Sequence, residues 1–439
     1  MTKHTSWGVF AIALAASGTP VLASPVAMFR GNAQHTGIYD ASGVPSFHGV
    51  MWQFHTGAAV VSSPVLSGGV VYVGSADHYL YALDAATGQL KWKFETKGRV
   101  SSSPAIADGG VYFESYDSYF YALDAATGAP RWKFQTGGEK RFAATHLHGI
   151  EPAAETMPDL FDVYLSSPTV LDGTVYFGSG DQYVYALDAK SGVLKWKFKT
   201  GDVVHASPAV ADHTVYIGSW DSYFYALNAD TGAEKWRFKS GEDPKIHNQV
   251  GFQSSAAVTN GTVYVGCRDS KLYALDAATG TKKWALDTKG SWVVGAPAVR
   301  NQRVYVATSD SGLFLEVDAQ TGKPDFSLGF KQWPMFSSPA VAGEDAYIGS
   351  HEGKLIAIDL KDRKVAWVYQ TDAARRNGAA YTKTDGTPNY EGAFGGSFYD
   401  DIVVGVSKMM SVGAVLSSPA VADGAVYFGS TDGNVYALR

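Results

Sequence analysis

One phrase recurs eight times along the chain, and this repeat limits what the chain can fold into. Its common form is SSPxxxxGxVYxGSxDxxxYALDAxTGxxxWxF. The interval from the proline position to the tryptophan position is 28 residues in six of the seven copies where both can be measured, and 29 in the other. A period of about 40 to 50 residues is typical of propeller blades. The proline positions are Pro64, Pro104, Pro168, Pro208, Ala256, Pro297, Pro339 and Pro419.

Each copy has the pattern of four short strands. The runs VVYVG (70–74) and YLYALD (79–84) are too short for helices and rich in β-branched and aromatic residues, which favours buried strands. DAATG (84–88) is typical of a hairpin in which the glycine supplies a positive φ. KWKFET (91–96) alternates as a half-exposed outer strand does. Four antiparallel strands in each of eight copies predict an all-β, eight-bladed β-propeller.

The last copy stops at YALR (436–439), without an outer strand of its own. An orphan strand pattern, GVMWQFHTG (49–57), precedes the first copy, and its Trp52 lies twelve residues before Pro64, the same interval as from Trp92 to Pro104. We therefore expect this N-terminal strand to pair with the strand that ends at Leu438. This pairing would close the ring and leave no open sheet edge.

The N-terminus has the pattern of a secretory signal peptide over residues 1–23, with Lys3, an apolar run and a Val-x-Ala ending. An extension (24–48) and a single propeller domain (49–439) are expected to follow. No later stretch is apolar enough to predict a transmembrane helix. Cys267 is the only cysteine, which excludes an intrachain disulfide and a CxxCH haem site, and no cysteine stands at the cleavage site to carry a lipid. These features predict a periplasmic or secreted monomer.

The formal charge of −6 argues against nucleic acid or an anionic membrane as the main partner. Three long insertions, 137–163, 240–251 and 371–412, all fall between the outer strand of one blade and the inner strand of the next. They therefore share one face of the predicted propeller. Loops on a rigid scaffold often carry function, so we expect an envelope protein or a small-molecule ligand to bind this elaborated face.

Several polar residues of this face break the repeat and are candidate metal ligands. His146 and His148 form a His-x-His pair that can bind a metal together with His205, His247 or a carboxylate, or can simply be solvated. Asp400 and Asp401 follow a glycine-rich bend and precede a strand-like run, IVVGV (402–406). They can bind Ca²⁺ or act as a catalytic base, or can mark a solvated loop end.

Other residues of the same face are candidates for contacting an organic ligand. Arg141, Arg375 and Arg376 can clamp carboxylates in a bidentate manner. Trp220 can stack on a planar ring, and the aromatic residues Trp292, Trp333 and Tyr116 can stack, seal the funnel or anchor a protein. The aspartate that recurs before each third strand is expected to form turns. Neither a GxSxG elbow nor a phosphate-binding loop is present, so hydrolase and NTPase functions have no support.

The segment VYVGSADHYLYALDAATGQLKWKF (71–94) and its copies resemble the PQQ-repeat superfamily of quinoprotein-like propellers over roughly residues 50–439. In that superfamily the recurrent tryptophan docks neighbouring blades. The resemblance implies either a scaffold without catalysis, such as the outer-membrane assembly component BamB, or a dehydrogenase that uses pyrroloquinoline quinone (PQQ) and Ca²⁺. The chain lacks the adjacent cysteines typical of the dehydrogenases and the lipid-bearing cysteine typical of BamB.

We therefore expect an exported scaffold or ligand-binding module in the cell envelope. The alternative is a PQQ- and calcium-dependent alcohol or sugar dehydrogenase. In that case Arg141, Arg375 or Arg376 would hold the quinone, with Asp400 or Asp401 near the metal.

Overall fold

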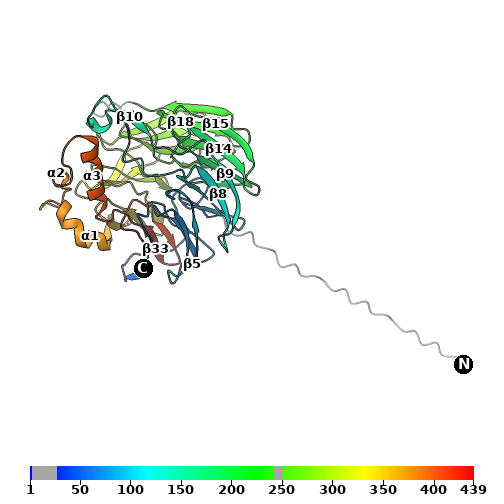
Figure 1. Cartoon of the computed structure of the whole chain (residues 1–439), viewed down its shortest axis with the longest axis horizontal. Coiled ribbons are helices and arrows are strands. Elements are labelled where there is room, and N and C mark those ends of the chain that lie inside the picture. The colour runs from blue at the N-terminus through cyan, green and yellow to red at the C-terminus, as the bar shows by residue number, and fades with distance from the viewer. Residues whose placement is uncertain (2–26, 242–250) are drawn as a thin grey trace.

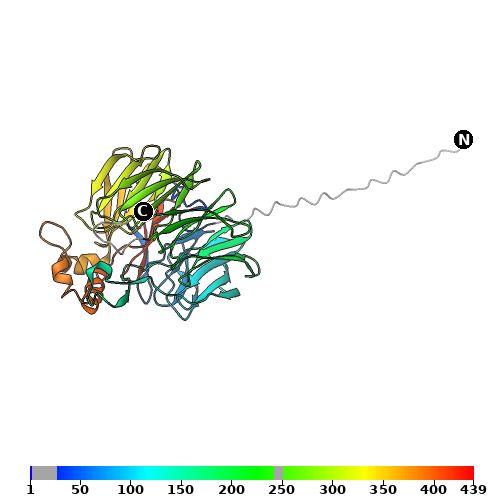
Figure 2. The same cartoon turned by 90° about the horizontal axis from the view of Figure 1, so that it is seen from above.

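The computed structural model describes residues 1, 27–241 and 251–439. Eight four-stranded antiparallel sheets surround a central channel (Figures 1 and 2). The predicted eight-bladed propeller is thereby confirmed. Apart from Met1, the predicted signal peptide lies outside the described residues, as does His247, so both stay predictions. Among the described residues, no helix is long and apolar enough to cross a membrane.

Each of the first seven blades takes its four strands from one continuous stretch of chain, with the first strand innermost. Blades 1 to 4 are formed by β2 (Val65–Ser67), β3 (Val70–Gly74), β4 (Tyr79–Asp84) and β5 (Leu90–Glu95); β6 (Ala105–Ala107), β7 (Gly110–Ser115), β8 (Tyr119–Asp124) and β9 (Pro130–Gln135); β12 (Thr169–Leu171), β13 (Thr174–Gly178), β14 (Tyr183–Asp188) and β15 (Leu194–Lys199); and β16 (Ala209–Ala211), β17 (Thr214–Gly218), β18 (Tyr223–Asn228) and β19 (Glu234–Lys239).

The ring continues with three more blades of the same kind and a last blade that joins the two ends of the chain. Blades 5 to 8 are formed by β20 (Ala257–Thr259), β21 (Thr262–Cys267), β22 (Lys271–Asp276) and β23 (Lys282–Asp287); β24 (Ala298–Arg300), β25 (Arg303–Ala307), β26 (Leu313–Asp318) and β27 (Pro324–Gly329); β28 (Ala340–Ala342), β29 (Asp345–Gly349), β30 (Lys354–Asp359) and β31 (Lys364–Gln370); and β32 (Ala420–Ala422), β33 (Ala425–Gly429), β34 (Asn434–Leu438) and β1 (Val50–His55).

The predicted ring closure is present. Strand β1 pairs antiparallel with β34, placing Val50 opposite Leu438 and His55 opposite Asn434. The N-terminal strand thus supplies the outer strand of blade 8, as expected.

The recurrent aspartates hold turns together, as expected. The Asp77 carboxylate accepts hydrogen bonds from the Gly57 amide (2.6 Å) and the Tyr81 hydroxyl (2.7 Å). It thereby ties the loop that enters the blade to the blade's third strand. The bond from a tyrosine four residues later recurs at Asp117, Asp181, Asp221, Asp269 and Asp432.

The recurrent tryptophan joins a blade to the next one wherever it is present, and blade 6 has Phe326 in its place. The Trp92 indole Nε1 donates to the carbonyl oxygen of Ala125 in the following blade (3.0 Å), and Trp284 bonds to Ala319 in the same way. The glycine of the facing hairpin makes room for this ring, because a Cβ on Gly128 would lie 2.7 Å from the Trp92 ring, and its φ is +72°. The same bond is made by Trp52, Trp132, Trp196 and Trp236.

The described part of the N-terminal extension closes the channel from the face opposite the insertions. Its carbonyl groups accept hydrogen bonds from the innermost strands of several blades, for example Ala33 from Val210 and Gly37 from Val341. The Arg30 side chain is fully buried and donates to the carbonyl oxygens of Pro339 (2.6 Å) and Pro297 (3.0 Å). The extension is therefore an integral part of the propeller.

The first and third insertions carry secondary structure of their own. The run IVVGV (402–406) was expected to be strand-like, but it lies within a helix, and this expectation was wrong. The helix places Gly405 and Met409 on one buried face, and this packing overrides the β-propensity of the run. The elements are β10 (Ala143–Thr145), η1 (Leu147–Gly149) and β11 (Thr156–Pro158), and α1 (Asp372–Asn377), η2 (Gly378–Tyr381), α2 (Tyr390–Ala393) and α3 (Tyr399–Met410).

Candidate functional site

The first insertion lies across the mouth of the channel and contacts blades on every side of it. Phe142 stacks on Trp220 of blade 4, with ring centroids 4.4 Å apart and the planes within 8°. The carbonyl oxygen of Phe161 accepts a hydrogen bond from Gln253 (2.8 Å). Tyr164, the residue directly after the insertion, reaches the far side of the ring, where its hydroxyl donates to the carbonyl oxygen of Leu416 (3.0 Å). We call residues 137–163 the lid.

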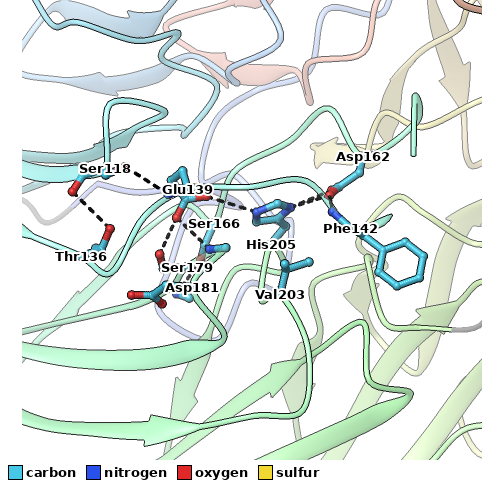
Figure 3. Close-up of polar contacts among 12 residues, drawn as sticks. Ser118, Thr136, Glu139, Phe142, Asp162, Ser166, Ser179, Asp181, Val203 and His205 are labelled. Carbon is cyan, nitrogen blue, oxygen red and sulfur yellow. Dashed lines mark hydrogen bonds and ion pairs between the residues drawn. The ribbon is translucent and has the colours of Figure 1, made fainter. Parts of the chain in front are cut away.

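A buried ion triad fixes one side of the lid. Figure 3 shows His205 between two lid carboxylates: Nδ1 is 2.8 Å from Asp162 Oδ1, and Nε2 is 3.3 Å from Glu139 Oε2. All three side chains are inaccessible to solvent. Burial lowers the pKa of His205, but Asp162 and Glu139 outweigh it and raise this pKa to about 10. The imidazole is therefore charged at neutral pH and donates to both carboxylates.

Backbone groups complete this network. The Asp162 carboxylate accepts the Phe142 amide hydrogen (2.7 Å), and Glu139 accepts hydrogen bonds from the Ser179 hydroxyl and the Gly180 amide. These bonds stabilise the charged carboxylates and connect the lid to blade 3 as well as to blade 4.

A second buried pair fixes the lid to blade 5. Arg268 Nη1 donates to Asp159, and Nε donates to Gln253 (2.9 Å). The guanidinium carbon lies 4.3 Å from the ring centroids of both Trp220 and Trp292, so the cation stacks against two indoles. Burial raises the pKa of Asp159, but Arg268 and His148 more than offset this and hold the pKa well below its ordinary value.

A third buried carboxyl group adjoins the triad. Glu114 of blade 2 is fully buried, and within the described part of the chain neither of its oxygens has a hydrogen-bond partner that meets ordinary geometry. Burial and the neighbouring Glu139 carboxylate raise the pKa of Glu114 well above its ordinary range. This shift favours the protonated form of Glu114, in which two adjacent buried negative charges are avoided.

A small cavity lies below the lid. It has a volume of about 40 Å³ and is lined by serine hydroxyls together with Phe29, Tyr164 and His205. A cavity of this size holds water molecules, whereas small-molecule sites usually enclose about 300 to 1,000 Å³. This cavity is therefore too small for an organic cofactor.

The third insertion extends the lid into a wider surface. The Glu151 amide donates to Ser397 (2.9 Å), and the Tyr399 amide donates back to Glu151 (3.0 Å), so the two insertions form a short parallel bridge. Trp333 anchors the other side of the third insertion, because its Nε1 donates to the Gly386 carbonyl oxygen (3.0 Å). Figures 1 and 2 show α3 beside the lid. We call these joined insertions the platform.

The candidate metal ligands do not gather into a metal site among the described residues. His146 is exposed, whereas His148 packs against Trp292 and lies 3.3 Å from Asp159. His205 is engaged in the triad. Among the described residues, no group of three or more His, Cys, Asp or Glu side chains could hold a metal ion. The assignment of His146, His148, Asp400 and Asp401 to a metal stays a prediction.

The candidate cofactor ligands do not converge on one site either. The Trp220 ring has Phe142 stacked on it and Arg268 over it. Arg375 lies on α1, where it is paired with Asp372, and Arg376 is exposed on the same helix. Arg141 belongs to the lid. As placed here, these side chains do not form a pocket for PQQ, and a role for them in binding a cofactor stays a prediction.

The residues that hold the lid in place were not predicted in this role from the sequence, although some of them stand at positions where the sequence departs from the repeat. Glu114 stands where the other copies have glycine, or alanine in one case. Arg268 occupies the position before the turn aspartate, which is also the position of Tyr116 and Trp220. Asp159 and Asp162 could not be found in this way, because the lid has no second copy with which to compare them.

Comparisons with known proteins agree with this architecture. The family model described as outer membrane protein assembly factor BamB matches residues 48–157, 153–285 and 221–439. No curated protein matches the chain.

Similar solved structures include BamB from Moraxella catarrhalis (TM-score 0.61, 16% identity, 89% of this chain and 97% of that chain). Another is a europium-containing methanol dehydrogenase (TM-score 0.67, 15%, 94% and 97%). A third is the quinohemoprotein alcohol dehydrogenase from Comamonas testosteroni (TM-score 0.66, 16%, 96% and 81%). At these identities the likeness shows the fold alone.

Proposed function

The chain belongs to the family of PQQ-repeat β-propellers whose model is described as outer membrane protein assembly factor BamB, and from this premise we propose that it is a binding scaffold of the cell envelope without catalysis of its own. Its elaborated face binds a protein partner. Export to the envelope rests on the predicted signal peptide.

The closed mouth of the channel carries this proposal. Two buried ion-pair systems, Glu139–His205–Asp162 and Asp159–Arg268, hold the lid in place. Both systems have their charges fully buried and paired, and they connect the lid to blades 3, 4 and 5, so the lid is fixed across the mouth of the channel. Because the lid is closed, the elaborated face is better suited to binding a protein on its outer surface than to admitting a cofactor into the channel.

The test adds PQQ and Ca²⁺ to the purified protein and measures its melting temperature and dye-linked alcohol oxidation. A binding scaffold gives flat traces. Turnover, or a shift of several degrees that Arg375→Ala abolishes, would instead contradict this proposal and favour the dehydrogenase. In parallel, a partner should co-purify from envelope extracts of the native host and be lost when residues 371–412 are replaced by a short Gly-Ser linker.

A further inference from the structure

The platform exposes large apolar side chains in a short stretch of chain. Phe398, Val403 and Val404 are 59%, 37% and 51% exposed, and Tyr390 of α2 is 42% exposed. The other exposed large apolar residues among those described are Met1, one residue that precedes β1, one in β1, and several in or directly before the outer strands of blades. A local concentration of exposed apolar area marks a binding surface more often than scattered single residues do.

This exposure is built into the way α3 packs. The opposite side of the helix is buried: Met409 clusters with Trp333 and Ala393, and Phe394 lies directly against Gly405. A Cβ on Gly405 would be 2.3 Å from the Phe394 ring. The helix therefore cannot rotate to bury Val403 and Val404 without losing these contacts.

Acidic residues flank the apolar side chains. Asp400 and Asp401 lie in the first turn of α3, and Glu151 is bridged to Phe398, with Glu155 four residues further along the lid. Among the described residues, none of these four carboxylates forms an ion pair. One basic side chain of α3 faces elsewhere, because Lys408 Nζ donates to the Ala393 carbonyl oxygen (3.3 Å).

One further cation lies near the patch. Arg141 of the lid is close enough to Tyr399 to lower its pKa, although burial, together with Asp159 and Asp400, keeps this pKa raised. Among the described residues, Arg141 forms no ion pair with the carboxylates that flank Phe398 and Val404.

The acidic charge of the patch indicates which kind of partner it can bind. A bilayer with anionic lipids would be repelled by the carboxylates, since such surfaces attract basic segments. A second copy of the chain would bring like charges together in a symmetric contact, which disfavours self-association. A protein segment with an apolar anchor between lysine or arginine residues complements both features of the patch.

We propose that the patch formed by Phe398, Val403, Val404 and the carboxylates of Asp400, Asp401, Glu151 and Glu155 docks a partner segment in which apolar residues are flanked by basic ones. This inference rests on the proposed function, because it names the class of partner that the platform binds. The apolar side chains supply the anchor contact, and the carboxylates select the basic flanks.

The test measures fluorescence anisotropy of a dye-labelled probe peptide, Leu-Phe-Leu with two lysines on each side, against the full chain. The peptide should bind, and a matched peptide with glutamates in place of lysines should bind about tenfold more weakly or worse. Val404→Glu, or Phe398→Ser as a second variant, should weaken binding of the lysine peptide about tenfold. The double change Asp400→Lys with Glu155→Lys should weaken it about fivefold or more.

Asp230→Lys is the matched control, because Asp230 is an exposed carboxylate on the opposite face and should leave binding unchanged. Equal binding of the two peptides, no binding of either, or wild-type binding by both apolar variants would overturn the inference. So would binding of phosphatidylglycerol vesicles, or self-association, that Val404→Glu abolishes. If the peptide test fails while shortening 371–412 still removes an envelope partner, the proposed function stands and only this inference falls.

Discussion

The indole Nε1 of Trp367 donates a 2.7 Å hydrogen bond to the carbonyl oxygen of Val44, a residue 323 positions earlier in the chain. The six other recurrent tryptophans bond to the hairpin between the third and fourth strands of the next blade. In blade 8 those strands, β34 and β1, have no hairpin between them. The segment that leads into β1 supplies the acceptor instead, so the N-terminal extension replaces the missing hairpin as well as the missing strand.

This replacement predicts the effect of Trp367→Phe. Loss of the hydrogen bond should lower the free energy of unfolding by about 1 to 2 kcal/mol, as is usual for a bond of this kind. Trp284→Phe is the matched control, because Trp284 makes the same bond to Ala319 within continuous blades. Urea unfolding should give similar losses for both variants. A loss for Trp284→Phe alone would show that the Trp367–Val44 bond contributes nothing to stability.

The Asp159–Arg268 pair should be strongly coupled. Either Asp159→Leu or Arg268→Met leaves one buried charge without its partner and should cost about 3 to 5 kcal/mol, while the double variant should recover much of that loss. A double-mutant cycle from urea unfolding measures this coupling. Additive losses would contradict the assignment of the pair as the link between lid and blade 5.

The pH dependence of Asp159→Asn follows from its depressed pKa. A carboxyl group whose pKa is lowered on folding contributes stability above its unfolded pKa, near 3.8, and loses it only as the pH falls towards the lower folded value. The difference in unfolding free energy between wild type and this variant should therefore be constant from pH 7 to about pH 4. A difference that already shrinks between pH 7 and 5 would contradict the depressed pKa.

His205 should give the opposite pH dependence. Because its pKa is raised on folding from 6.5 to about 10, the charged imidazole contributes fully below about pH 6.5, and this contribution is lost as the pH rises towards 10. The advantage of wild type over His205→Gln should fall by about 1.4 kcal/mol per pH unit where the slope is steepest. Melting curves from pH 6 to 10 measure it, and a pH-independent advantage would show that the imidazole is neutral in the fold.

Gly405→Ala should loosen the platform without melting the propeller. Alanine is normally the better helix residue by about 1 kcal/mol, but here its Cβ would collide with the Phe394 ring. Hydrogen exchange should become faster across 390–412 and stay unchanged in blades 1 to 6. Val404→Ala, an exposed position one residue away, is the control and should not accelerate exchange.

The fold was largely predictable because eight copies of one sequence motif indicate the same four-stranded structure. The run expected as a strand at 79–84 is β4 (Tyr79–Asp84), and the orphan strand expected within 49–57 is β1 (Val50–His55). Period-two alternation and turn residues are local signals, and repetition removes the ambiguity that each has alone.

The site was much less predictable, because its parts occur once. The strand-like expectation for IVVGV failed because the Phe394 ring and the buried Met409 select a helix, and neither contact is local in sequence. His205 was considered as a third metal ligand, whereas its partners are Glu139 and Asp162, which come from a loop without a periodic pattern. Glu114 was the clearest sequence indication that was overlooked. A charged residue at a glycine position of the repeat indicates that this position has a role other than in the repeated scaffold.

Closure of the ring by β1 and β34 also bears on how the chain folds. Blades 1 to 7 are each built from contiguous residues and can form as their segments become available, whereas the β1–β34 pairing joins the first and last strands described. Pairings between such distant segments form slowly, because a long loop must be ordered first. Until then, β34 is an unpaired edge that another chain can add to. The aggregation-prone species on the folding pathway should therefore be an open ring in which β1 has not yet paired with β34. Slowing this pairing should increase the population of the open ring.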